Sequence, residues 1–164
     1  RVPAMRKDFL IDPYQVLEAR VAGAGGVLLI VRMLSAAALS GLIGCAREHG
    51  LFVLLEAFDE ADLERMHEAI EVDAGRSTLL AGVNCRDLTT LEVIPERLLE
   101  LLPLMPRGVP RVAESGVEGS ADAARLARAG YGLILVGSVL MRADDPAGLA
   151  RLLLESGRAA REAS

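Results

Sequence analysis

The chain has 164 residues, a length that suits one globular domain with a buried core. Hydrophobic residues make up 52% of it but aromatic residues only 3%, so we expect a core of Ala, Val, Leu and Ile. This apolar content, with well-mixed charges, excludes an intrinsically disordered chain. The net charge of −5 offers no basic surface, which argues against a nucleic-acid partner.

A membrane and a metal ion are not expected as partners either. The longest apolar runs, residues 26–31 and 51–55, are too short to span a bilayer, and the first ten residues hold no signal-peptide core. Cys45 and Cys85 lack a CxxC partner, which predicts reduced thiols in a cytoplasmic protein. Two cysteines and two scattered histidines make no convincing metal site.

Six short apolar runs alternate with longer amphipathic stretches from end to end. The runs are near-continuous rather than alternating, which is typical of parallel strands covered on both faces. In chain order, the expected strands cover residues 2–5, 26–32, 51–56, 79–84, 110–114 and 132–137. The expected helices cover residues 12–23, 35–50, 59–75, 95–103, 119–130 and 146–160. The expected N-cap residues are Asp12, Ser35, Asp59 and Ser120, and Gly50 and Gly130 suit left-handed helix ends.

Alternating βα units predict an α/β fold with a parallel sheet and right-handed crossovers. Two architectures fit: an open doubly wound sheet, or part of a (βα)8 barrel. No GxGxxG follows the first strand and no GxxxxGK[ST] occurs, which weakens dinucleotide and P-loop interpretations.

Polar or glycine residues stand at the ends of five of the six expected strands. In a (βα)8 barrel these strand ends carry the chemistry, so together they predict a site. The residues are Lys7, Glu56, Asn84, Glu114 with Ser115 and Gly116, and Gly137 with Ser138.

Lys7 and Glu56 are the candidates for acid–base chemistry. Lys7 suits a general acid or a charge clamp, and the alternative is a surface lysine paired with Asp8. Glu56 closes an apolar strand and suits a general base, and the alternative is a solvated loop acid.

The remaining polar strand ends are less specific. Asn84 can orient a substrate hydroxyl without charge, and Arg86 and Asp87 are expected to form an ion pair that fixes the loop. Glu114 either orients the lysine or is buried structural polarity. Ser115 either binds substrate or belongs to a turn.

The glycine-containing turns at 115–117 and 137–138 predict a phosphate site. They follow the last two strands, which would be the seventh and eighth of a barrel if two units precede Arg1. Barrel phosphate sites are built from these loops, and glycine lets the backbone approach the anion. The combination predicts a small phosphorylated substrate, acid–base chemistry at its other end, and no metal.

Six stretches of this chain, in order and with comparable spacing, resemble indole-3-glycerol phosphate synthase of tryptophan biosynthesis. The motifs RKDF…DPYQ and GVN-x-RDL are quite specific, whereas AESG and VGS-x-LM are shared by related phosphate-binding barrels. The stretches are PAMRKDFLIDPYQVLEAR (3–20), VLLIVRML (27–34), VLLEAFDEADL (53–63), GVNCRDLTTLEV (82–93), VAESGV (112–117) and LVGSVLMR (135–142).

The resemblance implies a TIM barrel and a cytoplasmic, cofactor-free carboxy-lyase. Its substrate would be 1-(2-carboxyphenylamino)-1-deoxyribulose 5-phosphate, which undergoes ring closure, decarboxylation and dehydration. The resemblance also gives each candidate residue a family role. Lys7 would be the general acid and Glu56 the carboxylate used in dehydration, with Glu114 as a carboxylate near the lysine and Asn84 and Ser115 as substrate-orienting residues. Gly116, Gly137 and Ser138 would bind the phosphate, and Phe9 and Leu135 would be apolar walls for the aromatic ring.

The chain also departs from the family. The family's N-terminal helix and first two βα units, with a motif like E-x-K-x-x-S-P-S, are not found here. Six units cannot close an eight-stranded barrel. We therefore expect the C-terminal two-thirds of the enzyme, strands 3–8, as one partial domain over 1–164 that is inactive alone. The complete enzyme is expected to be monomeric, and a truly truncated chain to self-associate. The alternatives are another phosphate-binding barrel isomerase or epimerase, which would want paired Asp, and an inactive self-associating fragment.

Overall fold

A computed structural model describes residues 2–163, which fall into two compact units. Unit 1 runs to Gly82 and includes Pro106–Val109, and unit 2 comprises Val83–Met105 and the residues from Pro110 onward. The prediction of a single domain stays a prediction. The strands are β1 (Met5–Arg6), β2 (Gly26–Ile30), β3 (Phe52–Ala57), β4 (Leu79–Asn84), β5 (Arg111–Glu114) and β6 (Leu133–Leu135).

Helices follow the strands as the sequence predicts. They are α1 (Pro13–Val21), α2 (Ala36–Glu48), α3 (Glu60–Asp73), α4 (Arg97–Glu100), α5 (Ser120–Ala129), α6 (Ser138–Arg142) and α7 (Pro146–Glu162), with 3-10 turns η1 (Val31–Met33) and η2 (Leu102–Leu104). The strands are ordered β1-β2-β3-β4-β5-β6, as in the chain. This succession of βα units is the fold of a (βα)8 barrel in part, and the doubly wound alternative is wrong.

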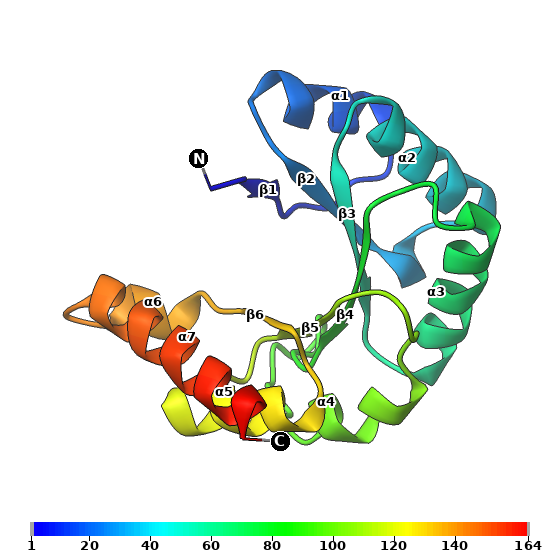
Figure 1. The fold of residues 1–164 in the computed structure, drawn as a ribbon. Coiled ribbons are helices and arrows are strands. Elements are labelled where there is room, and N and C mark those ends of the chain that lie inside the picture. The colour runs from blue at the N-terminus through cyan, green and yellow to red at the C-terminus, as the bar shows by residue number, and fades with distance from the viewer. Residues whose placement is uncertain (1, 164) are drawn as a thin grey trace. The chain divides into compact units, whose positions relative to one another are not determined.

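The strands of unit 1 form a parallel sheet. Met5 pairs with Gly26, and Ile30 pairs with Glu56 at the carboxyl end of β3. All five residues of β2 are buried, because helices cover one face of the sheet and side chains fill the other. Figure 1 shows α1, α2 and α3 on one side of these strands.

Gly26 is needed where β2 begins. A Cβ at this position would lie 2.4 Å from the ring of Phe52, its register partner on β3. The glycine therefore lets the Phe52 ring pack flat across the start of the sheet.

Three of the expected helix caps in unit 1 are confirmed. The Asp12 carboxylate accepts the backbone N–H of Tyr14 and forms a capping box with Gln15. Ser35 accepts the N–H of Ala38, and Asp59 accepts the N–H of Asp62.

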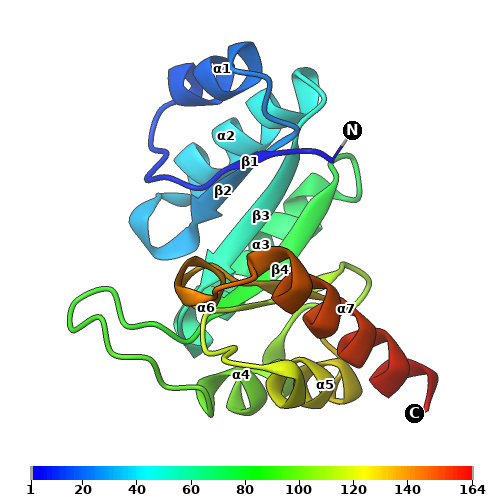
Figure 2. The same ribbon diagram turned by 90° about the vertical axis from the view of Figure 1, so that its left-hand side faces the viewer.

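Unit 2 contains a second parallel pair, β5 and β6, with Glu114 opposite Leu135. Figure 2 shows α5 and α7 of this unit side by side. Gly130 ends α5 with a φ of 119°, in the left-handed region as expected. The prediction that Ser120 is the N-cap is wrong: Gly119 occupies that position, and Asp122 reaches back to accept the N–H of Glu118 instead.

The predicted boundaries differ from the structure at short elements. The first strand was expected at 2–5 but covers only Met5–Arg6, because Pro3 has no N–H to donate to a neighbour. The expected strand 26–32 ends at Ile30, and Val31–Met33 form a 3-10 turn. The helix α6 was not predicted.

Both cysteines are free, Cys45 half-buried and Cys85 buried. Burial raises the pKa of both thiols. Among residues 2–163 there is no helix with the length and apolar character that crossing a bilayer requires.

Candidate active site

Lys7 and Glu56 form a close ion pair in unit 1. The Nζ of Lys7, just beyond β1, lies 2.7 Å from Oε2 of Glu56, the next-to-last residue of β3. The Glu56 side chain is only 1% exposed, whereas that of Lys7 is 42% exposed. The idea that Glu56 is a solvated loop acid is therefore wrong, and Lys7 is a partly exposed lysine beside a buried carboxylate.

The alternative interpretation, in which Lys7 pairs with Asp8 at the surface, is wrong. It pairs with Arg6 at 3.2 Å and accepts the backbone N–H of Phe9. That N–H and the Arg6 guanidinium hold the pKa of Asp8 below its ordinary value. The two neighbouring cations thus have different carboxylates.

Lys7 is the single lysine among these 164 residues, and the other 17 basic residues are arginines. Arginine stays protonated at any physiological pH, whereas a lysine amine can give up a proton. The chain therefore has one side-chain amine, and it lies against the buried carboxylate.

The loop after Lys7 is held by the Gln15 side chain at the start of α1. Its Oε1 accepts the N–H groups of Ile11 and Asp12, and its Nε2 donates to the carbonyl of Phe9. Phe9 itself is more than half exposed. The RKDF…DPYQ motif thus fixes the backbone that carries Lys7 and Phe9.

The phosphate-loop residues predicted from the sequence do come together in unit 2. They line a cavity of about 170 Å³ formed by the ends of β5 and β6 and the turns that follow. Its lining includes Ser115, Gly116, Leu135, Gly137, Ser138 and also Arg86. Leu135, expected as a wall for an aromatic ring, lies with the candidate phosphate residues.

Two successive residues at this cavity, Ser115 and Gly116, have left-handed backbones, with φ of 68° and 69°. A Cβ at Gly116 would also lie 2.8 Å from Sγ of Cys85. Glycine is therefore required at 116 both by φ and by space. A serine held in this conformation is strained, and such strain gathers at functional sites.

Asn84 and the loop after it are fixed by local hydrogen bonds. Asn84 is buried, and its Oδ1 accepts the N–H of Arg86. The Arg86 guanidinium donates to the carbonyl of Leu91, and Asp87 accepts the N–H groups of Thr89 and Thr90. Figure 2 shows the segment between β4 and α4 as a long loop. The expected ion pair between Arg86 and Asp87 is therefore wrong, since the two side chains bond different parts of the loop, and the sequence did not identify Arg86 as a residue of the cavity.

Glu114 ends β5 and is fully buried, and its carbonyl accepts the N–H of Cys85. Whether its carboxylate orients Lys7 stays a prediction. Within the described residues, no three side chains of His, Cys, Asp or Glu gather as a metal ion would require.

Arg32 forms a cluster that the sequence did not reveal. Its Nε donates to Oδ2 of Asp62 at 2.7 Å and its Nη2 to Oδ2 of Asp59 at 2.5 Å. The guanidinium carbon lies 4.6 Å from the centre of the Phe58 ring. The partners are 27 and 30 positions away in the chain, beyond the reach of local pattern.

The family model and the related sequences that match this chain carry the same name. A family model described as indole-3-glycerol phosphate synthase matches residues 1–153. Proteins of that name from Parafrankia sp. and Salinibacter ruber are 44% and 43% identical over 156 and 159 residues. The alignments cover 95% and 96% of this chain but 56% of each relative, so the chain spans about half the length of the curated relatives it matches.

A solved structure of 3-hexulose-6-phosphate synthase from Salmonella typhimurium shares the fold, with a TM-score of 0.76. The alignment covers 96% of this chain and 74% of that chain. At 20% sequence identity, the likeness concerns the fold alone.

Proposed function

Because the chain belongs to the indole-3-glycerol phosphate synthase family, we propose that it carries the acid–base and phosphate-binding residues of that lyase. The reaction would convert 1-(2-carboxyphenylamino)-1-deoxyribulose 5-phosphate into indole-3-glycerol phosphate, CO₂ and water. The observation that carries the proposal is the contact between the single lysine and a buried carboxylate. The expected setting is the cytoplasm, with a small-molecule substrate.

Lys7 is the general acid of this proposal. Its ammonium group, held by Glu56, donates a proton to the substrate carbonyl oxygen while a ring carbon attacks the carbonyl carbon. The oxygen becomes a hydroxyl, and loss of CO₂ from the ring carbon that attacked restores aromaticity. Lys7, reprotonated from solvent, would supply the second proton with which the hydroxyl leaves as water.

Glu56 is the proton acceptor of the later step. Its Oε2 is already within hydrogen-bond distance of the Lys7 amine, so the pair can pass a proton between its members. Removal of a substrate proton by this carboxylate would accompany loss of the hydroxyl. Asn84, Ser115 and Glu114 keep the orienting roles that the family resemblance implies.

The phosphate would occupy the cavity formed by Ser115, Gly116, Gly137 and Ser138. Gly116 lets the backbone approach the anion, and the Ser138 hydroxyl and Arg86 line the same space. Phe9 and Leu135 remain the proposed apolar contacts of the aromatic ring.

The test compares Lys7→Arg with Lys7→Met in a protein that includes the expected N-terminal units, by steady-state turnover of the carboxyphenylamino substrate. A general acid is lost in both variants, so both should lower kcat by about 100-fold or more. A charge clamp would survive in Lys7→Arg, because arginine keeps the positive charge but cannot release its proton. Near-normal turnover in Lys7→Arg would remove the acid role.

The phosphate site has its own variant. Ser138→Asp places a carboxylate in the cavity and should raise the KM for the phosphorylated substrate with less effect on kcat. Ser120→Asp makes the same change on α5, outside the cavity lining, and should leave KM unchanged. Equal KM values for the two variants would show that the phosphate does not bind in this cavity.

A chain that turns over sugar phosphates instead of the carboxyphenylamino substrate would support the isomerase alternative.

A further inference from the structure

The position of the Glu56 carboxylate depends on the turn that follows β3. Glu56 is followed by Ala57 at the strand end, by Phe58, and by Asp59, the N-cap of α3. Its neighbour across the sheet is Ile30, the last residue of β2. A contact that ties the segment after Ile30 to the segment after Glu56 would therefore fix the carboxylate from both sides.

Arg32 makes this connection. It lies two residues beyond Ile30, in η1, and its guanidinium bridges Asp59 and Asp62 while it covers the Phe58 ring. Arg32 thus contacts the side chains of the turn after β3, and Asp62 connects the cluster to the backbone of that turn.

Asp62 is the buried centre of this cluster. Its side chain is 5% exposed, and its Oδ2 accepts both the Arg32 guanidinium and the backbone N–H of Phe58 at 2.9 Å. Phe58 is two residues from Glu56. A charge-assisted hydrogen bond to this backbone restricts the turn more than a neutral bond would.

The guanidinium keeps its charge in this environment. Burial by itself would lower the pKa of Arg32, but the hydrogen bond and charge of Asp62, with those of Asp59, outweigh burial and raise it. The cluster is therefore an ion-paired network rather than a single surface contact, which is the kind that contributes to rigidity.

We propose that Arg32 and Asp62 are positioning residues for Glu56: they fix the turn after β3 and so hold the Glu56 carboxylate against Lys7. They do not act on the substrate themselves. The effect on turnover rests on the proposed function, whereas the effect on the Lys7–Glu56 contact does not.

The experiment uses Asp62→Asn, which keeps the side-chain shape, and Arg32→Lys, which keeps the charge but lacks the planar guanidinium that bonds Asp59 and Asp62 and covers the Phe58 ring. Two quantities are measured. The first is kcat and KM with the carboxyphenylamino substrate, in a protein that includes the expected N-terminal units. The second is the rate at which an amine-reactive reagent acylates Lys7, followed by mass spectrometry of the Lys7 peptide so that a lysine introduced at position 32 does not contribute. A misplaced catalytic group lowers kcat by about 10- to 100-fold, and KM should change by less than about threefold. Acylation should be faster by about three- to tenfold, because the Glu56 carboxylate then holds the Lys7 amine less closely.

Asp73→Asn is the matched control. Asp73 is also buried, at 2% exposure, pairs with an arginine, Arg47, and accepts a backbone N–H, that of Ser77. It lies at the end of α3, however, just before β4 begins and away from the Glu56 turn. This variant should lose thermal stability as Asp62→Asn does, while kcat and the acylation rate of Lys7 stay unchanged.

The outcomes separate the possibilities. If Asp62→Asn and Arg32→Lys match Asp73→Asn in both measurements, the positioning role is refuted and the cluster only stabilises the fold. If Asp62→Asn does not fold, the milder Arg32→Lys decides. If a protein that includes the expected N-terminal units has no turnover, the proposed function fails, and the acylation rates alone confirm or refute the positioning of Glu56.

Discussion

Replacing Glu56 with Gln should raise the reactivity of the Lys7 amine by about tenfold. The Nζ–Oε2 distance of 2.7 Å is that of a charge-assisted hydrogen bond. Such bonds contribute about 1.5–3 kcal/mol. Because the Lys7 side chain is 42% exposed, solvent weakens the interaction, and we take the lower end, about 1.5 kcal/mol. That free energy holds the amine against the carboxylate, and its loss should raise the rate at which the amine reacts about tenfold.

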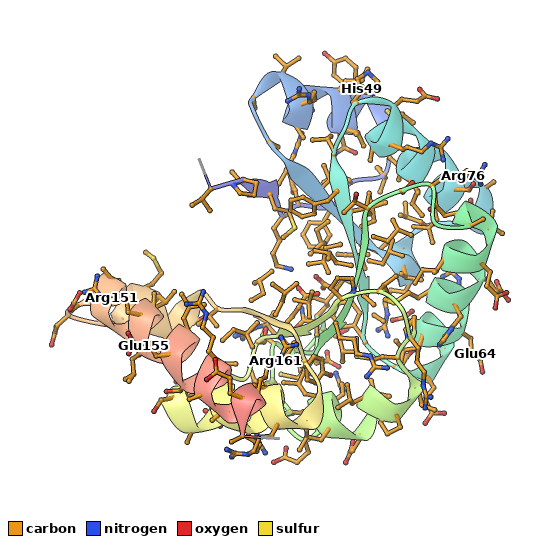
Figure 3. All side chains as sticks on the ribbon, in the orientation of Figure 1. His49, Glu64, Arg76, Arg151, Glu155 and Arg161 are labelled. Atoms are coloured by element: carbon orange, nitrogen blue, oxygen red, sulfur yellow. The ribbon has the colours of Figure 1, made fainter. Side chains whose placement is uncertain are left out.

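The assay is direct because the 164 residues contain one lysine. The chain is treated with trinitrobenzenesulfonate at constant pH, and mass spectrometry separates the modified Lys7 peptide from the modified amino terminus. Glu64→Gln makes the same chemical change on the exposed surface of α3, where Figure 3 shows the side chain pointing away from the strands. Equal modification rates in the Glu56 and Glu64 variants would refute the reasoning, because the ion pair would then have no effect on the reactivity of the Lys7 amine.

Other substitutions and pH changes test the fold around the site. Gly41→Ala should stabilise the protein by about 0.8–1 kcal/mol, because Gly41 lies inside α2 and its added Cβ meets no atom within 4 Å; thermal unfolding measures the gain. Tyr131→Phe should cost about 1–3 kcal/mol, since the buried hydroxyl donates to a backbone carbonyl at 2.6 Å; the urea midpoint should fall at constant m-value. The N–H groups of Thr90 and Thr89 lower the pKa of Asp87, so its stabilisation of the loop is full above the ordinary carboxyl pKa and is lost as pH falls through the lowered value. The amide shifts of these threonines against pH, with Asp87→Asn as a pH-independent control, would show it.

The sequence predicted the alternation of elements because the strands of this fold are buried on both faces. A run such as 26–30 is apolar at every position, which is typical of a strand covered on both faces. The candidate residues at strand ends followed from the same pattern, since parallel strands bring their carboxyl ends to one edge. Glu56 and the glycines of the two loops were therefore placed at strand ends without any structural information, and their roles stay predictions.

The sequence could not predict contacts that depend on long-range packing. Arg32 was expected at a strand end, but its role depends on carboxylates far along the chain. Ser120 looks like an N-cap by residue type, yet it is the first residue of α5 and Gly119 is the N-cap, while the Asp122 carboxylate accepts the N–H of Glu118 before the helix. The five-residue helix α6 is too short to show a period.

Because the single lysine lies one residue beyond a two-residue strand, proteolysis at this lysine can also measure how often the backbone around it opens. An endoprotease specific for lysine has a single cleavage point in these 164 residues, after Lys7. The protease can cut only when the backbone around Lys7 detaches from β2 and from the Gln15 side chain. When opening and reclosing are fast, the cutting rate measures the free energy of that local opening. Substrate that binds Lys7 should slow the cut, so proteolysis can follow occupancy of the site in variants that no longer turn over.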